Sequence, residues 1–365
     1  MKRIIKLFLY ALISIVIVGL IYSLIPRVFN GGNTYGNGLP KSDYLKDKIE
    51  NEINRYIQDS SSRIETVVCL KEGEIVYEFG DTKKLINTRS IRKSIMNLLY
   101  GIAVDKGVLN INETLESLGI DESQTPLTEQ EKTATIRDLL MARSGVYLPA
   151  EGEVATTRDN RPNRDQYKPG EYFLYNNFDF NVLGAILEKK TNMSIGEFME
   201  EYLAKPLQLQ DFSSSNIVYD NPWPIPNKSM SDYPIYWIFM STRDLAKVGL
   251  LVSQKGNWNG EQIVPAEWIN ESTQPYTKYE DYDINQNPID AYGYLWKIDT
   301  DNNNIWADGY GGQYLIIDTE NNLVTTQLNP NGNSLLSSGL YLMDENRDNA
   351  SRIEIMNIHN MILEN

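Results

Sequence analysis

The sequence predicts an α+β fold in which an antiparallel sheet is built from both ends of the chain, with flanking helices and an inserted, mostly helical region. Strand-like runs occur early, at residues 63–80, and again late, at residues 291–329. Helical spacing of apolar residues dominates the chain between them. This distribution is typical of a sheet that both chain ends complete around a helical insertion. An uncharged apolar run at residues 7–25 also predicts a transmembrane helix before the domain.

The flanking charges of the apolar run predict its orientation. Three basic residues lie within residues 1–6, whereas only Arg27 follows closely. By the positive-inside rule, residues 1–6 form a cytoplasmic stub, residues 7–25 a single-pass anchor in the cell membrane, and the rest of the chain is extracytoplasmic. A cleaved signal peptide is the alternative. The small-residue cleavage site that it needs is missing, so an uncleaved anchor is favoured.

A flexible linker is predicted at residues 26–42, because this segment is rich in Gly and Asn. The folded domain is then expected to span residues 43–365, opening with a helix and a hairpin across residues 71–74. Further predicted helices cover residues 90–106, 135–145, 180–207, 240–256 and 351–365.

Composition excludes several classes of function. The 365 residues carry a formal net charge of −15, so the basic footprint of a nucleic-acid binder is missing. Cys69, the only cysteine, cannot form an internal disulfide, and its apolar neighbours predict a buried strand position. His359 is the only histidine, which disfavours a zinc site and predicts a packing or surface residue. A catalytic base in this chain is therefore expected to be something other than histidine.

A serine and a lysine open the first helix of the inserted region. Apolar residues follow at helical spacing, so Ser90 stands at the helix start and Lys93 lies three positions on. Side chains at i and i+3 share a helix face, which allows Lys93 to lie beside the Ser90 hydroxyl. An ordinary N-cap serine followed by a surface lysine is the alternative on these two residues alone.

A second stretch offers a partner for such a lysine. Lysine can activate a serine when burial or a nearby cation lowers its pKa, and a tyrosine hydroxyl suits proton transfer to the leaving group. Tyr175, Asn176 and Asn177 stand directly before a helical pattern, where rigid elements hold polar side chains in place. A capping Asn and an amphipathic core Tyr form the alternative.

Three glycines, Gly309, Gly311 and Gly312, interrupt a strand-like run. Glycine inside a strand often marks close approach of a backbone or a ligand. A backbone N–H here, with that of Ser90 at its helix start, would form an oxyanion hole. A β-bulge or a turn is the alternative.

Together, these stretches resemble the motifs of the serine β-lactamase and penicillin-binding protein superfamily. Residues 90–93 (SIRK) are similar to its Ser-x-x-Lys motif, and residues 175–177 (YNN) to the Tyr-x-Asn motif of its class C branch. Residues 309–315 (GYGGQYL) stand where that branch carries a strand motif with Lys or His before a Gly. The stretch that begins at residue 175 most resembles the 6-aminohexanoate-dimer hydrolase and esterase side of the group. The resemblance covers residues 45–345.

The resemblance implies roles for individual residues. Ser90 would be the acylated nucleophile, and Lys93 and Tyr175 would share the roles of general base and general acid. Which of the two takes the first proton stays open, because coupled groups titrate together. The implied substrate-binding residues are Asn177, Tyr310 and Gly312, and the implied oxyanion donors are the backbone N–H groups of Ser90 and Gln313. No cofactor or metal is implied.

The function implied is that of a membrane-anchored, extracytoplasmic serine hydrolase that forms an acyl-enzyme from an amide or ester. Tyr310 departs from the family pattern, because a cation there commonly faces a substrate carboxylate and tyrosine is uncharged near neutrality. Cell-wall peptides, D-alanyl esters of wall polymers, small oligoamides and β-lactams are the alternative substrates. A catalytically weak, penicillin-binding-protein-like wall-binding or sensor module is the alternative function, and Tyr310 favours it.

Overall fold

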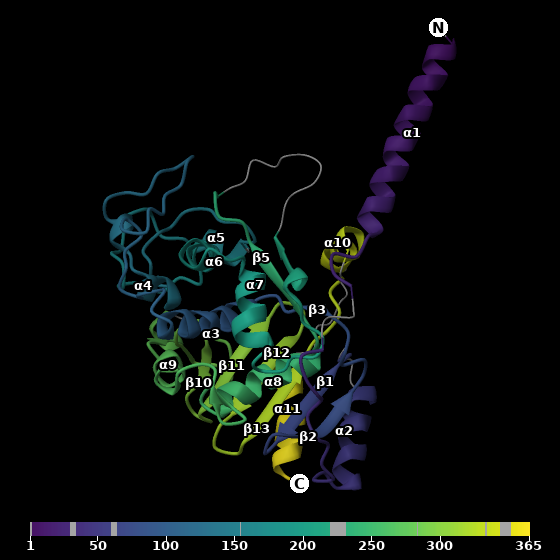
Figure 1. Ribbon diagram of the computed structural model, residues 1–365, viewed down its shortest axis with the longest axis vertical. Helices are drawn as coiled ribbons and strands as arrows, with labels where there is room; N and C mark the ends of the chain where they lie inside the picture. The colour runs from purple at the N-terminus through teal and green to yellow at the C-terminus, as the bar shows by residue number, and fades with distance from the viewer. Residues whose placement is uncertain are drawn as a thin grey trace.

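The centre of the protein is an eight-stranded antiparallel sheet that both ends of the folded chain complete (Figure 1). This confirms the predicted α+β fold with its antiparallel sheet. In sheet order, the strands are β2 (Glu74–Phe79), β1 (Val67–Lys71), β13 (Leu323–Gln327), β12 (Gln313–Asp318), β11 (Asn304–Gly309), β10 (Lys297–Asp299), β9 (Ala291–Tyr292) and β8 (Thr277–Lys278). The computed structural model describes residues 2–29, 34–59, 64–153, 155–219, 231–282, 284–332, 334–343 and 352–365.

Helices and two small sheets surround this central sheet. The helices are α1 (Lys2–Leu24), α2 (Asp47–Asp59), α3 (Ile91–Asp105), α4 (Ile136–Leu140), α5 (Ala155–Asp159), α6 (Asn177–Thr191), α7 (Ile195–Met199), α8 (Thr242–Ser253), α9 (Ala266–Ser272), α10 (Leu335–Met343) and α11 (Arg352–Leu363). Short 3₁₀ segments lie at Glu131–Thr133, Ser214–Asn216 and Tyr279–Tyr282, and one π-helical turn lies at Glu200–Ala204. The small sheets are β3 (Ile86–Asn87), β5 (Tyr236–Met240) and β4 (Ile217–Tyr219), and β6 (Asn257–Trp258) with β7 (Glu261–Gln262).

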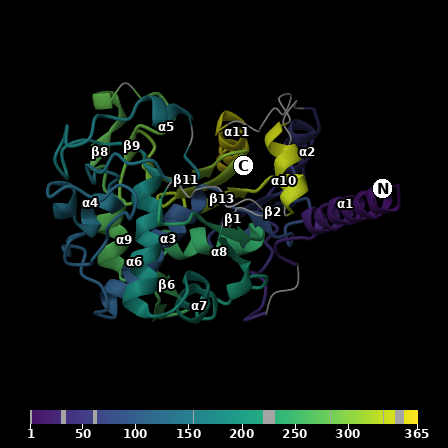
Figure 2. The same ribbon diagram turned by 90° about the horizontal axis from the view of Figure 1, so that it is seen from above.

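Both faces of the central sheet are covered. Figure 2 shows α2 and α11 on one side of the strands and α3 and α8 on the other. Successive strand residues point to opposite faces. Gly249 of α8 lies against Val324, whereas His359 of α11 hydrogen-bonds to the next residue, Thr325, at 2.9 Å. Because both faces of the sheet are covered, every residue of β12 and β13 is buried, without alternation of buried and exposed positions.

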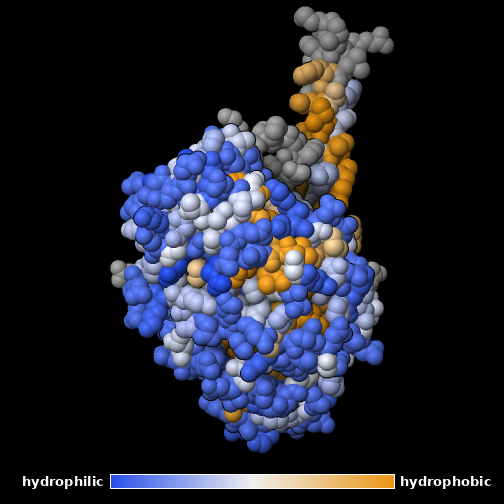
Figure 3. Space-filling view, turned by 60° about the vertical axis from the view of Figure 1, so that its left-hand side comes forward, coloured by the Kyte–Doolittle hydropathy of each residue, from blue (hydrophilic) through white to orange (hydrophobic). Residues whose placement is uncertain are grey.

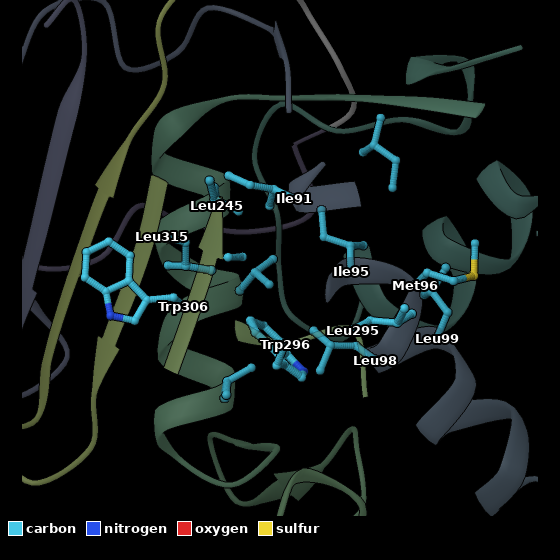
Figure 4. Packing of buried hydrophobic residues seen from close by; sticks show 14 of the residues in the cluster. Ile91, Ile95, Met96, Leu98, Leu99, Leu245, Leu295, Trp296, Trp306 and Leu315 are labelled. Atoms are coloured by element: carbon cyan, nitrogen blue, oxygen red, sulfur yellow. The ribbon is translucent and has the colours of Figure 1, made fainter. Parts of the chain in front are cut away.

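Helix α3 is the hub of the core. Every residue from Ile91 to Ala103 is buried, and Figure 4 shows its apolar side chains packed against those of the sheet and of α8. A Cβ on Gly101 would lie 2.4 Å from the Trp268 ring, so α9 approaches the helix closely. The Trp268 indole also donates to the Asn97 carbonyl at 3.0 Å. The first turn of α3 is therefore held rigidly from several sides.

Helix α1 projects away from the domain and exposes apolar side chains, Phe8 among them at 72% (Figures 1 and 3). The segment predicted to span the membrane, residues 7–25, lies largely on this helix. Among the helices of the described residues, none has the length and apolar character needed to cross a bilayer. The structure therefore gives the predicted transmembrane helix no support.

The chain that follows α1 runs along the domain from residue 34 onward, in irregular conformation. The Tyr35 N–H donates to the Leu209 carbonyl at 3.0 Å, and the Ser42 N–H donates to the Ile75 carbonyl at 2.9 Å. Residues 30–33 of the predicted linker lie outside the described residues.

Candidate active site

Ser90 stands where a short strand turns into the core helix. Strand β3 pairs with β5, and the Thr88 N–H then donates to the Ile238 carbonyl at 2.9 Å. Arg89 takes a left-handed conformation, with φ of 52°. Ser90 occupies the N-cap position of α3, but its side chain makes no capping hydrogen bond. The hydroxyl of this half-buried residue therefore serves something other than the helix end.

Lys93 supplies the partner of that hydroxyl. Its Nζ donates to Ser90 Oγ at 2.8 Å, as expected for side chains three residues apart on one helix face. Lys93 is only 4% exposed. Its Nζ lies 4.5 Å from the ring centre of Tyr175 and 4.7 Å from that of Phe180. Two aromatic rings and the interior of the protein thus enclose this amine.

The surroundings of Lys93 favour its neutral form. Burial lowers the pKa of the amine well below the ordinary value of 10.5, and the cations Arg92 and Lys297 lower it further. The carboxylate of Asp308 acts in the opposite direction but is outweighed. In the described part of the chain, no carboxylate lies within ion-pair distance of Lys93. A neutral lysine has a free electron pair and can accept a proton.

Tyr175 comes to the same place from the loop before α6. Its ring centre lies 4.5 Å from Lys93 Nζ, and the ring packs against Phe180 and Tyr292 with centroid distances of 4.9 and 6.1 Å. Burial raises the pKa of the phenol above its ordinary value, which the nearby Ser90 hydroxyl only partly offsets. The structure thus brings Ser90, Lys93 and Tyr175 together, although the tyrosine comes from a segment far along the chain.

The two asparagines after Tyr175 fix the start of α6. Asn176 is its N-cap: the Oδ1 atom accepts from the Phe178 N–H at 3.1 Å, and Nδ2 donates to the Val146 carbonyl at 2.7 Å. Asn177, the predicted substrate-binding residue, is half-buried and donates to the Glu151 carbonyl at 3.3 Å. The capping alternative therefore holds for Asn176, whereas Asn177 has a polar side chain on the first helical turn beside Tyr175.

The predicted glycine-interrupted strand is a hairpin, in which residues 310–312 connect β11 to β12. Gly311 and Gly312 have φ of 91° and 80°, which favour glycine. Tyr310 is 54% exposed. A Cβ on Gly309 would lie 2.6 Å from the Thr88 carbonyl oxygen, so the end of β11 touches the backbone just before Ser90. Close backbone approach and a turn are thus both present.

Gln313 lies opposite Gly309 in the strand register and is fully buried. Its side chain pairs with the backbone of Asn329: Nε2 donates to the carbonyl, and Oε1 accepts from the N–H, both at 2.9 Å. This bidentate contact fixes the start of β12 next to the segment that touches residues 88–89. The oxyanion role predicted for the Ser90 and Gln313 backbone N–H groups stays a prediction.

Sequence reasoning missed a charged cluster beside Tyr175. Lys297 of β10 lies 5.8 Å from the Tyr175 ring centre and 2.6 Å from Asp308 of β11. Arg352 of α11 reaches the same carboxylate at 2.8 Å. Burial alone would raise the pKa of Asp308, but the two cations hold it below its usual range. In the sequence, the one signal of this cluster was the presence of charged residues within the predicted strands.

Arg92 is a variable position between Ser90 and Lys93 in the Ser-x-x-Lys motif, yet here it is completely buried. Its Nη2 donates to Asn181 at 3.1 Å, and its guanidinium lies 4.4 Å from the Tyr236 ring centre. This buried cation contributes to the low pKa of Lys93.

Other reactive side chains lie away from this site. Cys69 is buried in β1, and burial raises the pKa of its thiol to about 12, so it is no nucleophile. His359 is buried between α11 and the sheet, as a packing residue. Among the described residues, no group of three or more His, Cys, Asp or Glu side chains is placed to hold a metal ion.

Comparison with known proteins adds to this geometry. A family model described as Beta-lactamase matches residues 67–350. Protein flp of Staphylococcus aureus (strain MW2) is 24% identical over an alignment of 280 residues, and the match covers 67% of this chain and 54% of that protein. The chain thus spans about half the length of the curated relatives it matches.

Solved structures share the fold at low sequence identity. A Bacillus anthracis protein, provisionally named as a 6-aminohexanoate-dimer hydrolase, has a TM-score of 0.62 at 16% identity, covering 94% of this chain and 92% of that one. A family VIII carboxylesterase has a TM-score of 0.62 at 15% identity, covering 92% and 100%. At such identities the likeness shows the fold alone.

The environment of Lys93 generates a testable pH dependence. If Lys93 must be neutral to accept the Ser90 proton, labelling of Ser90 by a fluorophosphonate should slow as pH falls, with a midpoint well below 10.5. Intact-mass measurements over time at each pH give the rate. A midpoint at or above 10.5, or the same pH dependence in Lys93→Ala, would contradict the assignment.

Proposed function

The chain belongs to the beta-lactamase family, and we propose that it is a serine hydrolase that cleaves an amide or ester through an acyl-enzyme on Ser90. The observation that carries the proposal is the 2.8 Å contact between Ser90 Oγ and the amine of Lys93. This amine is buried, and among the described residues it forms no ion pair with a carboxylate. An amine in this setting is kept neutral and aimed at the atom it would deprotonate.

The proposed reaction has two halves. In the first, Ser90 Oγ attacks the carbonyl carbon while its proton passes to Lys93, and the oxyanion accepts hydrogen bonds from the backbone N–H groups of Ser90 and Gln313. The carbon–nitrogen or carbon–oxygen bond then breaks, and the leaving group takes a proton by way of Tyr175. In the second half, water attacks the acyl carbon, the bond between that carbon and Ser90 Oγ breaks, the same groups pass the proton of the water to Oγ, and the carboxylic acid product leaves.

The opposite pKa shifts support this division of roles. Burial lowers the pKa of Lys93 and raises that of Tyr175, so it widens the range of pH over which both groups are uncharged. A neutral amine is a proton acceptor and a neutral phenol is a proton donor. We therefore infer that Lys93 takes the first proton and that Tyr175 relays it.

A set of variants tests the shared machinery. Ser90→Ala should abolish fluorophosphonate labelling, because the acyl-accepting oxygen is gone. Lys93→Ala and Tyr175→Phe should each reduce kcat/KM for p-nitrophenyl butyrate by roughly 10²–10⁴-fold, the usual effect of removing a general acid or base. The double variant should lose little more, since residues that act as one unit are not additive.

Lys205→Ala is the matched control, because Lys205 forms a surface ion pair with Glu201. Additive losses from the Lys93 and Tyr175 changes would show independent roles and contradict the relay. Labelling that survives in Ser90→Ala would show that the nucleophile is another residue.

The substrate class proposed is a neutral amide or ester, small or derived from the cell wall. Tyr310 is exposed at the tip of the hairpin whose base touches residues 88–89, and it offers a hydrogen bond without a charge. A substrate whose recognition needs a carboxylate, such as many β-lactams, finds no cation at this position. A family VIII carboxylesterase shares this fold, which is consistent with an ester substrate.

Adding a charge at position 310 should change the preference. Tyr310→Lys should raise the ratio of kcat/KM for mono-p-nitrophenyl succinate over p-nitrophenyl butyrate by about two- to fivefold, the effect of an exposed ion pair. Tyr276→Lys, at an exposed tyrosine of the β8 edge, is the control and should leave the ratio unchanged. An unchanged ratio in Tyr310→Lys would remove Tyr310 from the substrate-binding residues.

A catalytically weak wall-binding or sensor module is the second candidate, favoured by the missing cation at position 310. It differs in one measurable step: such a module would be acylated but would not turn over. Intact-mass analysis after p-nitrophenyl butyrate or a penicillin separates the two, because a lasting mass increase marks slow deacylation.

We also propose that residues 7–25 anchor the protein in the cell membrane, with the hydrolase domain outside. The support is the uncharged run with its basic N-terminal flank, and the exposure of its apolar side chains, such as Phe8 and Ile15. These side chains stand away from the domain core.

Surface proteolysis tests the location. Trypsin added to intact cells that express the full chain should remove the domain, while a cytoplasmic marker protein stays intact. Complete protection of the domain, or a soluble form that starts after residue 25, would contradict an uncleaved anchor.

A further inference from the structure

The carboxylate of Asp308 works against a neutral Lys93. It lies at the end of β11, next to Gly309, which touches the backbone of Thr88. Its negative charge favours the protonated form of Lys93, against the effect of burial. Inside a protein, where the effective dielectric constant is low, a free carboxylate at this place would act strongly as a counter-ion.

Both oxygens of this carboxylate are occupied by other cations. Lys297 Nζ lies 2.6 Å from Oδ1, while Arg352 reaches Oδ2 with Nη2 at 2.8 Å and Nε at 2.9 Å. The Gln286 side-chain oxygen accepts from Lys297 at 2.7 Å and from Arg352 at 3.2 Å. Gln286 thus links the two cations, and both are also paired with Asp308.

We propose that Lys297 is a positioning residue of the active site: with Arg352, it holds Asp308 so that this carboxylate does not pair with Lys93. The inference rests on the proposed function, in which Lys93 is the base. Lys297 and Lys93 lie 5.8 and 4.5 Å from the centroid of the same ring, that of Tyr175, and the charge of Asp308 acts on both lysines.

The charge balance explains why Lys297 is needed. Asp308 between two cations gives a cluster of net charge +1, which disfavours a further positive charge on Lys93. Without Lys297, Oδ1 would lose its ion-pair partner, and a buried carboxylate without a partner is costly. Lys93 would then become the compensating cation, and Ser90 would lose its base.

Groups from every neighbouring element enter this balance. Those that face Lys93 are Ser90 and Arg92 at the start of α3, Tyr175 before α6, Lys297 of β10 and Asp308 of β11. Of these, Asp308 is the one whose charge opposes a neutral lysine.

The test is a double-mutant cycle on the pH dependence of fluorophosphonate labelling, with the full chain. The labelling rate falls at low pH as Lys93 becomes protonated, and we call this part of the pH profile the acid limb. Lys297→Met should move the acid limb to higher pH by about one pH unit or more, the size of a charge effect at close range. At a fixed pH below the limb, each pH unit by which the limb moves should slow labelling about tenfold. In the Asp308→Asn background, Lys297→Met should move the limb by clearly less than in the wild-type background, because only the direct repulsion between the two lysines is lost and no carboxylate is released.

Two further variants make the result specific. Lys297→Arg keeps a cation beside Asp308 and should restore most of the wild-type limb. Arg352→Gln releases Oδ2 from a position nearer the surface and should shift the limb in the same direction as Lys297→Met. If Lys297→Met does not fold, as judged by circular dichroism, Arg352→Gln carries the same test.

The outcomes separate this inference from the proposed function. If the wild-type protein is not labelled at Ser90, the proposed function fails. If it is labelled with an acid limb, but neither Lys297→Met nor Arg352→Gln moves that limb, the role of Lys297 is overturned while the hydrolase stands. An equal shift of Lys297→Met with and without Asp308 would likewise overturn it, because Lys297 would then act without the carboxylate.

Discussion

The site depends on one constraint: the amine of Lys93 must stay out of water beside Ser90. An exposed lysine is protonated near neutrality and has no electron pair with which to accept a proton. Here the amine lies against the faces of Tyr175 and Phe180, at the start of a helix that is buried on all sides. The rings attract a cation, but the loss of water around the amine outweighs that attraction and lowers its pKa. Packing, more than any single contact, thus creates the chemistry.

This constraint explains the close packing around the first turn of α3. If water reached Lys93, the desolvation that keeps it neutral would be lost. The end of β11 therefore lies directly on the backbone before Ser90, where only glycine fits: a Cβ on Gly309 would meet the Thr88 carbonyl oxygen at 2.6 Å. The side chain of Gln313 fixes the adjoining strand to Asn329. Sheet and helix are held in one relative position by contacts that leave no room for a side chain.

The parts of the site that the sequence predicts are those set by local geometry. Ser90 and Lys93 meet because they are three residues apart on one helix, and the strands follow from short apolar runs. Tyr175 is a candidate from its place before a helix, and the family resemblance implies its role, but its position beside Lys93 depends on long-range folding. Tyr310, which stands where the family commonly has a cation, lies at an exposed turn.

The cluster of Lys297, Asp308 and Arg352 could not be predicted in the same way. Lys297 pairs with Trp306 across β10 and β11, so Asp308 is its diagonal neighbour on the same face. That relation depends on the strand register. A shift of one strand by two residues leaves the same side chains on the same face, so the periodicity of the sequence does not distinguish such registers. Arg352 needs in addition the docking of α11 on the sheet, 44 residues further along the chain. Charge pairs of this kind follow only from tertiary structure.

The same burial acts in opposite senses on the two proton carriers, and this has a mechanistic consequence. Loss of solvation disfavours whichever form is charged, so it makes Lys93 a weaker holder of its proton and Tyr175 a stronger one. Burial thus shifts both groups toward the neutral state, and for Lys93 the nearby cations Arg92 and Lys297 act in the same direction. When Lys93 and Tyr175 are both neutral, the proton of the Ser90 hydroxyl can pass to the Lys93 amine, and Tyr175 keeps its own proton. No tyrosinate is formed in this step. A tyrosinate base would instead need a buried anion, against the direction in which burial shifts its pKa. In the proposed mechanism, a lysine base with a tyrosine relay fits the directions of both pKa shifts, and a change that admits water or an unpaired carboxylate would favour the protonated form of Lys93.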